Sequence, residues 1–389
     1  MAKATASADL DFFDGEPLLR IIATALVDLS RRQTAPDPVY PDVVQRAFNH
    51  LVLLCMRRGK DELPESVPDM VRWAAERPVR TWPLELPTDF EAADGFLIDK
   101  ETWSPTQACI EWAVPARDPA AEQFENLLME EAIETCRAAK APDSYTAFRK
   151  LLITKPVLTG TQIALLAGDI DLSLLHEVIK RSYEPASAAY LRDGVYAVCE
   201  RCGCLLVPVH EDEYRCELDR CRRDTRARVK TTYEHGHQGG LFQLTRPLRM
   251  FITGPGLAET DLETELVKLR LPVEMWPNFD AYDLRITMPD GRVWAIDVKD
   301  RANPALLGRS ARAFRPDPHF DEAFLVVPRY RFAEREDYQR IFDSHRPDGL
   351  TGHLALVSDN ELLDLVRKAL RRIKRTQKTA ATNPGASDA

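Results

Sequence analysis

Five of the eight cysteines of this 389-residue chain lie between positions 199 and 221. Four of them form a C-x2-C pair and a C-x4-C pair separated by thirteen residues, namely Cys199, Cys202, Cys216 and Cys221. Two short knuckles at this separation can direct four thiolates at one tetrahedral Zn²⁺ ion. Gly203 suits the tight turn that lets backbone amides face the sulfurs. We therefore expect a structural zinc ribbon in which Cys204 is a spare thiol.

Two alternative ligand sets remain open for this zinc site. Cys204 could replace Cys202, or a histidine of the following segment, His235 or His237, could serve as a ligand. Four cysteines already close a structural site, so a histidine is not required. A closed zinc site gives a substrate thiol no access, and we therefore do not expect thiol redox chemistry.

A second group of reactive side chains consists of Asp283, Asp297 and Lys299. Residues 282–286 and 293–298 alternate or run apolar, as strands do, and a turn-forming Pro-Asp-Gly sequence separates them. Because side chains alternate along a strand, Asp297 and Lys299 project to the same face. Pairing of the two strands then brings Asp283 close to them.

This combination suits metal-assisted hydrolysis of a phosphodiester bond. Two carboxylates bind Mg²⁺ or Mn²⁺, hard cations that take oxygen ligands, and the backbone carbonyl of Val298 could supply another oxygen. A bound metal lowers the pKa of its water, while Lys299 can orient that water and stabilise charge on the phosphate. The competing interpretation is a surface ion pair between Asp297 and Lys299, because a D-x-K triplet occurs by chance in many proteins. Its place at the end of an apolar strand favours the catalytic interpretation.

Apolar spacing also predicts the elements before and after the two strands that carry Asp283 and Asp297. A helix with Leu262, Leu266 and Leu269 on one face precedes it. Downstream, the pattern predicts a helix, a buried strand, a further helix and another strand before a basic terminal helix. These four elements span residues 304–314, 324–327, 338–342 and 354–357.

Over residues 246–369 the chain resembles the PD-(D/E)xK restriction-endonuclease-like superfamily, because Asp283 and Asp297-Val298-Lys299 match its motif. The resemblance implies an α-β-β-β-α-β core, although one middle strand is not visible in the pattern. It also implies a further glutamate from the preceding helix, for which three residues compete, namely Glu259, Glu263 and Glu265. Helical geometry places Glu265 on the flank away from the sheet's expected polar end. We favour Glu259, because residues 256–259 look like the superfamily's glycine-then-glutamate helix start, with Glu263 second.

A narrower resemblance involves residues 276–284 and 294–300, which follow the helical and cysteine-containing regions. These segments look like the restriction-endonuclease-like protein of prokaryotic PIWI-RE islands. The resemblance implies a role in defence against phages or plasmids. It also implies two partners, a PIWI/Argonaute-like protein that chooses the target through a guide and a helicase.

We expect an α+β multidomain architecture with an amino-terminal α-helical region, a zinc ribbon and a carboxyl-terminal α/β restriction-endonuclease-like domain. Between the amino-terminal helical region and the ribbon, the sequence contains three short helical patterns, over 159–166, 172–179 and 186–191. Together they can form a helix-turn-helix or winged-helix unit. The expected limits are 1–142 for the helical domain, 143–195 for the small helical module, 196–245 for the ribbon, 246–378 for the nuclease domain and 379–389 for a disordered tail.

The formal net charge of −9 conceals a concentration of basic residues. Residues 220–230 carry a local charge of +5 and residues 367–378 a charge of +7, which leaves −21 for the rest. No acid interrupts a third basic group, which consists of Arg301, Arg309, Arg312 and Arg315. Such patches suit contact with DNA phosphates, and the alternative is a set of solvated helix faces.

The sequence shows no secretory signal and no apolar stretch long enough to span a membrane, so we expect a cytoplasmic protein. Two function hypotheses follow. The first is a DNA endonuclease dependent on Mg²⁺ or Mn²⁺, for which symmetric cutting of both strands would imply a homodimer. The second is a non-catalytic zinc-ribbon DNA-binding or scaffold protein with a degenerate nuclease fold.

Overall fold

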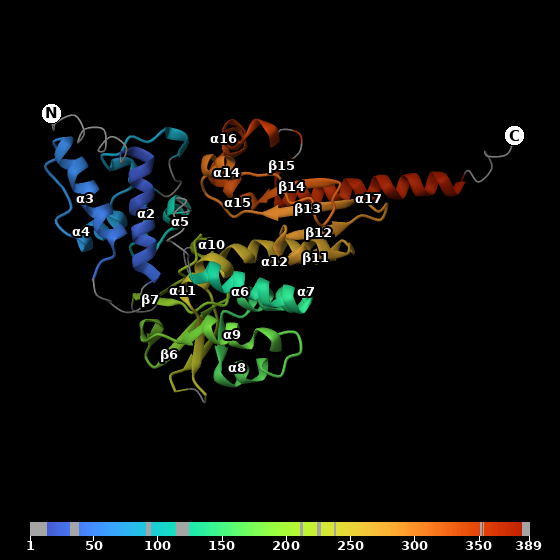
Figure 1. Ribbon diagram of the computed structural model, residues 1–389, viewed down its shortest axis with the longest axis horizontal. Coiled ribbons are helices and arrows are strands. Elements are labelled where there is room, and N and C mark those ends of the chain that lie inside the picture. The colour runs from blue at the N-terminus through green and yellow to red at the C-terminus, as the bar shows by residue number, and fades with distance from the viewer. Residues whose placement is uncertain are drawn as a thin grey trace.

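The computed structural model describes residues 14–31, 39–90, 95–113, 124–210, 213–223, 227–236, 239–350, 352 and 354–382. The amino-terminal helices, the cysteine-containing ribbon and the carboxyl-terminal sheet domain meet around helix α12 (Gly254–Lys268) (Figure 1). Among the described residues, no helix combines the length and the apolar character that crossing a membrane requires.

The amino-terminal region is helical, as its apolar spacing predicts. Its elements are α2 (Gly15–Arg31), α3 (Asp42–Arg57), α4 (Val67–Glu76), the 3₁₀ turns η1 (Val79–Thr81) and η2 (Thr88–Phe90), the short strands β1 (Ile98–Asp99) and β2 (Ser104–Pro105), and α5 (Gln107–Ala113). Leu18, Ile22 and Leu26 line the buried face of α2, because positions three and four apart share one side of a helix. Cys55 and Cys109 are buried in the same apolar cluster.

Helices α6 (Phe124–Ala139) and α7 (Pro142–Thr154) belong to a different apolar cluster from α2–α5. Cys136 and Phe148 pack there with side chains of the sheet domain, so the two helices join the following regions rather than the preceding ones. The apolar core therefore changes between residues 113 and 124, whereas we expected a domain limit at 142. Helix α7 lies alongside α12 (Figure 1).

The small helical module pairs two of its strands with a strand from beyond the ribbon. Its elements are β3 (Val157–Thr159), α8 (Gly160–Leu166), the 3₁₀ turn η3 (Ser173–Leu175), α9 (His176–Ser182), β4 (Tyr183–Pro185) and, after the ribbon, β10 (Leu241–Leu244). The strand order β3-β10-β4 is antiparallel throughout, an arrangement typical of winged-helix units. The expected third helix is wrong, because Ala188–Tyr190 forms only a 3₁₀ turn, η4.

The ribbon is inserted between β4 and β10. Its elements are β5 (Leu191–Arg192), β6 (Val195–Cys199), β7 (Val207–His210), β8 (Glu213–Arg215), α10 (Asp219–Arg222) and β9 (Val229–Glu234). Strands β7 and β8 pair as the ribbon hairpin that we expected, and β9 pairs with β6.

The carboxyl-terminal region is a five-stranded sheet covered by helices. Its elements are α11 (Arg246–Leu248), a π-helical turn (Arg249–Thr253), α12, β11 (Val273–Met275), α13 (Pro277–Asp280), β12 (Leu284–Thr287), β13 (Val293–Val298), α14 (Pro304–Ser310), β14 (Glu322–Val327), α15 (Arg329–Glu334), α16 (Tyr338–His345), the 3₁₀ turn η6 (Asp348–Leu350), β15 (Ala355–Ser358) and α17 (Asp359–Thr382). The strand order is β11-β12-β13-β14-β15, with an antiparallel meander followed by two parallel pairings. Strand β11 completes the three consecutive strands of the expected core, but it is the first of them and lies at the edge of the sheet, whereas we expected the hidden strand to be a middle one.

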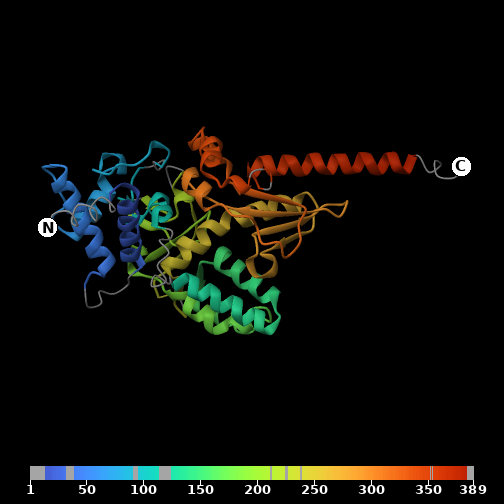
Figure 2. The ribbon, with the colours of Figure 1, turned by 45° about the horizontal axis from the view of Figure 1, so that its top comes forward.

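The two faces of this sheet have separate apolar cores. Trp294 and Ile296 face the core shared with α12 and α17, whereas Leu325 faces the core shared with α14 and α16. Helix α14 ends at Ser310, four residues before the expected limit. Helix α17 extends well past the sheet (Figure 2) and continues to Thr382, so it includes the first residues of the expected tail; residues 383–389 lie outside the described part of the chain.

Candidate functional site

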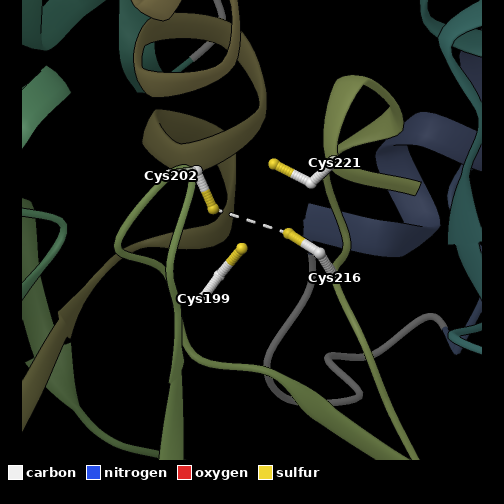
Figure 3. A group of neighbouring side chains, drawn as sticks. All are labelled: Cys199, Cys202, Cys216 and Cys221. Atoms are coloured by element: carbon white, nitrogen blue, oxygen red, sulfur yellow. Dashed lines mark hydrogen bonds between the residues drawn. The ribbon is translucent and has the colours of Figure 1, made fainter. Parts of the chain in front are cut away.

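The four predicted zinc ligands converge in a buried pocket of the ribbon. The Sγ atoms of Cys199, Cys202, Cys216 and Cys221 all lie within 4.8 Å of one another, and they point toward a common centre (Figure 3). The Sγ atoms of Cys202 and Cys216 are 3.5 Å apart. Zn–S bonds of 2.3 Å in a tetrahedron place sulfurs about 3.8 Å apart. The spacing of the thiols therefore fits a zinc ion without rearrangement of the chain.

The backbone of the two knuckles is arranged for charged sulfur ligands. Gly203 adopts a left-handed conformation with φ of 75°, which a residue with a Cβ rarely takes. The amide of Cys204 donates to the Cys202 Sγ at 3.5 Å, and the amide of Leu218 donates to the Cys216 Sγ at 3.4 Å. Hydrogen bonds from the Cys202, Cys216 and Cys221 thiols lower the pKa of Cys199, whereas hydrogen bonding to Cys199 raises the pKa of Cys202 and Cys216. Among these thiols, Cys199 is therefore the one that ionises most readily.

The alternative zinc ligands lie elsewhere. Cys204 is buried but is not a member of the converging group. His235 is exposed in the turn after β9, where its ring lies 6.3 Å from that of Tyr196. His237 lies outside the described residues. The ligand set that the structure supports is the one with four cysteines.

The sheet domain gathers the predicted acids and the lysine at the end of β13. Asp283 immediately precedes β12, Asp297 lies in β13, and Lys299 directly follows that strand. The Lys299 Nζ lies 2.7 Å from the Asp297 Oδ1 and 3.5 Å from the Asp283 Oδ2. The antiparallel register of β12 and β13 produces this approach, because Leu284 pairs with Ile296 and the preceding residue then lies opposite Asp297.

Asp283 is held rigidly at this sheet end. Its Oδ2 accepts a hydrogen bond of 2.6 Å from the Val298 amide, so the strand that carries Asp297 also orients the neighbouring carboxylate. Burial opposes ionisation of Asp283, but Lys299 and Arg149 outweigh that effect and hold its pKa below the usual value. Asp283 is therefore more readily ionised than an ordinary aspartate.

Asp297 and Glu259 are in the opposite electrostatic situation. Burial, reinforced by the Asp283 carboxylate, raises the pKa of Asp297 to about 8 despite the adjacent Lys299. Burial likewise raises the pKa of Glu259 to about 7 despite its contact with Arg149. Both carboxyl groups therefore lack sufficient positive charge nearby, which is the condition under which a divalent cation binds favourably.

Glu259 reaches the group from α12, whereas the competing glutamates do not. The Glu259 Oε2 accepts a hydrogen bond of 2.6 Å from the Trp276 Nε1, and its side chain is only 4% exposed. Glu263 lies on the same helix but pairs with Lys150 at 3.0 Å. Glu265 forms a surface pair with Lys268 at 2.6 Å.

A residue that the sequence reasoning missed, Arg149 of α7, lies among these acids. Its guanidinium is 3.2 Å from the Glu259 carboxylate and 3.7 Å from the Asp283 Oδ1, and it also pairs with Asp280. It stacks over Trp276, with its Cζ 4.9 Å from the ring centroid. No local pattern distinguishes Arg149, because it reaches the site from a helix more than a hundred positions earlier in the chain.

The loop that carries Asp280 has an unusual backbone. Trp276, Asn278, Phe279 and Asp280 all have positive φ, with values of 49°, 48°, 55° and 72°. Non-glycine residues rarely adopt this region, and such conformations cost about 1–3 kcal/mol each and cluster at functional sites. The loop therefore stores strain where it presents Asp280 to Arg149.

The four arginines predicted to contact nucleic acid have different surroundings. Arg312 and Arg315 are exposed in the segment after α14, and Arg301 is half-buried. Arg309 pairs with Glu16 of α2 at 2.7 Å and lies over Phe90, so its charge links the sheet domain to the amino-terminal helices. The six basic residues of the α17 segment whose side chains are described are all exposed, namely Arg367, Lys368, Arg371, Arg372, Lys374 and Arg375.

The amino-terminal helices hold the loop that follows Lys299. The buried Glu111 of α5 accepts hydrogen bonds from the amides of Ala302 and Asn303, at 2.5 and 2.8 Å. Arg331 pairs with Asp300 at 2.7 Å and with Asp219 of the ribbon at 3.1 Å. These contacts lie beside a cavity of about 710 Å³ at the junction of the three regions. The position of the D-x-K loop therefore depends on the whole chain.

Two separate segments match known protein families. Residues 18–159 match the family described as pPIWI_RE three-gene island domain Y. Residues 256–374 match the family described as REase associating with pPIWI_RE, where REase denotes a restriction endonuclease. No curated protein and no solved structure matches the chain. The chain is thus similar in two regions to components of the pPIWI_RE islands, and the segment similar to their restriction endonuclease contains all the gathered acids and Lys299.

Proposed function

We propose that this protein is an endonuclease that hydrolyses DNA phosphodiester bonds with Mg²⁺ or Mn²⁺ and acts in the defence system of a pPIWI_RE island. The observation that carries the proposal is the approach of Asp283, Asp297 and Lys299 at one end of β13, with Glu259 joined to Asp283 through the Arg149 guanidinium. The match to the pPIWI_RE-associated restriction endonuclease spans the same residues. A PIWI/Argonaute-like protein and a helicase are the partners that this assignment implies.

The carboxylates of Asp283, Asp297 and Glu259, with the backbone carbonyl of Val298, would hold the divalent ion. Oxygen donors of this kind are the ligands that Mg²⁺ and Mn²⁺ prefer. Counting Asp280, four acids face only two cations, Arg149 and Lys299, so the group as a whole lacks positive charge. A bound ion would activate a water molecule and neutralise charge on the scissile phosphate.

Lys299 is positioned to act on the reacting phosphate. Asp297 holds its ammonium group at 2.7 Å, and the Lys299 side chain remains 36% exposed, compared with 6% for Asp283. The accessible side of the group is therefore the side that carries the lysine. An ammonium fixed there stabilises the negative charge that develops as the phosphodiester bond breaks.

Two basic surfaces are suited to hold the rest of the substrate. Arg312 and Arg315 follow α14, within fifteen positions of Asp300, and α17 offers a row of exposed cations. Contacts of this kind go to phosphates, so they provide affinity without sequence selection. The ribbon has a positioning role, since Arg220 pairs with Asp261 of α12 at 2.7 Å and Arg222 with Asp99 at 3.2 Å.

Cleavage of supercoiled plasmid and of linear duplex DNA in Mg²⁺ tests this proposal. Replacing Lys299 by alanine should lower the cleavage rate by roughly 10²–10³-fold, because a fixed charge that stabilises the transition state is lost. The matched control is Lys268→Ala, which removes an exposed lysine paired with Glu265 and should leave the rate unchanged. Equal cutting by the wild-type and Lys299→Ala proteins would remove Lys299 from the mechanism.

A second candidate function is a DNA-binding or scaffold protein that does not cut. The observation that favours it is the burial of Glu259 and Asp283, together with the presence of Arg149 between them. This alternative predicts DNA binding that is equal with and without Mg²⁺, and no nicking by any variant. The cleavage assay therefore separates the two functions directly.

A further inference from the structure

The Arg149 guanidinium occupies the position that a metal ion would need. It bridges Glu259 and Asp283, two of the three carboxylates that we assign to the metal, at 3.2 and 3.7 Å. It is almost completely enclosed, with 12% of its side chain exposed, and the Trp276 ring covers one face. While the guanidinium remains there, both Glu259 oxygens and the Asp283 Oδ1 face it rather than a divalent ion.

We propose that Arg149 is an internal counter-ion that blocks the metal site, so that a divalent ion binds only when Arg149 moves away from Glu259 and Asp283. This inference rests on the proposed function. It makes α7, an element outside the sheet domain, the control on metal loading.

The charge of the site explains why a protein cation is needed in the absence of metal. Several carboxylates lie within one buried cluster, and buried acids without a partner cost several kcal/mol each. Lys299 neutralises Asp297 and part of Asp283, but it has no contact with Glu259 within salt-bridge distance in the described structure. Arg149 supplies the missing positive charge, and burial does not discharge it because Glu259 and Asp280 hold its pKa well above the ordinary value.

Asp280 provides a second place for the guanidinium. It pairs with Arg149 from the strained loop, and the Tyr145 hydroxyl is within 3.4 Å of both residues. The Asp280 side chain is 29% exposed, and we do not assign it to the metal. Arg149 can therefore release Glu259 and Asp283 while it keeps one charged partner, which makes exchange with a divalent ion feasible without unfolding.

The packing of α7 against α12 sets the resting position of Arg149. Ile153, one turn after Arg149, fits against Gly256, where a Cβ would lie 2.4 Å from its Cδ1. Lys150 pairs with Glu263 on the outer side of the same two helices at 3.0 Å. A shift of α7 relative to α12 would therefore withdraw the guanidinium from the site.

Titration of Mn²⁺ by isothermal calorimetry and by electron paramagnetic resonance tests the proposal on the full chain. Arg149→Ala should bind Mn²⁺ at least tenfold more tightly than the wild type, because the competing cation is gone. Its melting temperature without metal should fall, and Mn²⁺ should raise that temperature more than it does for the wild type. Arg149→Gln, which keeps a polar group beside Asp280, should show the same tighter binding and serves if the alanine variant does not fold.

Two controls define the outcome. Lys268→Ala, which removes an exposed pair within α12, should leave Mn²⁺ affinity at the wild-type value. Asp283→Ala should abolish the binding and so identifies the site. Equal Mn²⁺ affinity of the wild type and both Arg149 variants, with binding still dependent on Asp283, would overturn the blocking role and leave the nuclease assignment standing. If no protein shows Mn²⁺ binding that depends on Asp283, and none cuts DNA, both the blocking role of Arg149 and the nuclease assignment are overturned.

Discussion

The thiol cluster of the ribbon and the carboxylate cluster of the sheet domain are both buried groups of four potential ligands, but their charges are managed differently. Among the described residues, the four thiols are the one group of at least three potential metal ligands whose donor atoms all lie within 4.8 Å of one another. In the carboxylate cluster, Arg149 and Lys299 lie between or beside the acids. The thiol cluster is therefore open to a metal ion, whereas the carboxylate cluster already contains two protein cations, Arg149 and Lys299.

Under the proposed function, this difference corresponds to two different uses of a metal. A closed tetrahedral site holds its ion permanently and adds the binding free energy to folding. A site that exchanges its ion during function must remain folded without it, and internal cations make that state tolerable because they neutralise the acids. We therefore expect the zinc to be required for stability and the divalent ion of the carboxylate site to be dispensable for folding.

The largest expected effect is loss of the zinc ligands. The Cys199→Ser/Cys216→Ser protein should lose about one zinc per chain, and the 191–234 segment should unfold, since structural zinc contributes on the order of 10 kcal/mol in small zinc domains. Metal analysis and circular dichroism measure the result. Cys204→Ser is the matched control and should retain its zinc, since that thiol is not among the converging ligands. Retention of zinc by the double variant would refute the ligand assignment.

A smaller effect is expected from pH on the carboxylate site. The pKa of Glu259 is raised to about 7 by burial, so the folded state keeps a proton that the unfolded state releases at lower pH. Because the folded state binds more protons, the stability of the metal-free protein falls as pH rises through this pKa, by on the order of 1 kcal/mol between pH 6 and pH 8 for this group. Denaturant unfolding of the wild type and of Glu259→Gln at pH 6 and pH 8 measures this change in the free energy of unfolding.

The glutamine variant should lose less stability than the wild type over that interval, by on the order of 1 kcal/mol. The thiol site has the opposite pH dependence, because zinc binding requires thiolates and weakens as pH falls. Zinc content should therefore be measured at both pH values and should stay constant. If the free energy of unfolding changes equally with pH in the wild type and in Glu259→Gln, the pKa of Glu259 is not raised.

The smallest effect is expected from Gly256→Ala. The added Cβ would approach the Ile153 side chain to 2.4 Å, and the overpacking should exceed the gain in helix propensity by about 1 kcal/mol. Gly168→Ala is the matched control, because a Cβ there meets its nearest atom, the Leu165 carbonyl oxygen, at 3.6 Å. Melting temperatures compare the two, and zinc content should be unchanged in both. A Gly256→Ala protein as stable as Gly168→Ala would show that α7 is free to shift.

Much of the fold was accessible from sequence where the signal is local. The buried strands β13 and β14 were predicted close to their observed limits, and the amino-terminal region was expected to be helical. The three-residue strand β11 was missed because a segment that short has no measurable period. The expected helix at 186–191 failed because three residues there, Ala186, Tyr190 and Leu191, pack against β6 and β10 around a short turn instead.

Among the candidate catalytic residues, some positions follow from local sequence spacing and others depend on tertiary packing. Asp297 and Lys299 share a strand face by simple alternation, so their proximity follows from the sequence. The choice of Glu259 over Glu263 depends on how α12 packs, which only the tertiary structure decides. Whether these residues carry catalysis remains a prediction that the cleavage assay tests.

By itself, the sequence determined that four cysteines form two closely spaced pairs and that Asp297 and Lys299 share one face of a strand, because both features follow from the spacing of neighbouring residues. The tertiary structure alone decided that Arg149 lies among the acids, that the loop after Lys299 is held by Glu111, and that the ribbon is inserted between two paired strands. These features depend on contacts between segments far apart in the chain, and local patterns of hydrophobicity and spacing contain no information about which distant charge will neutralise a buried acid.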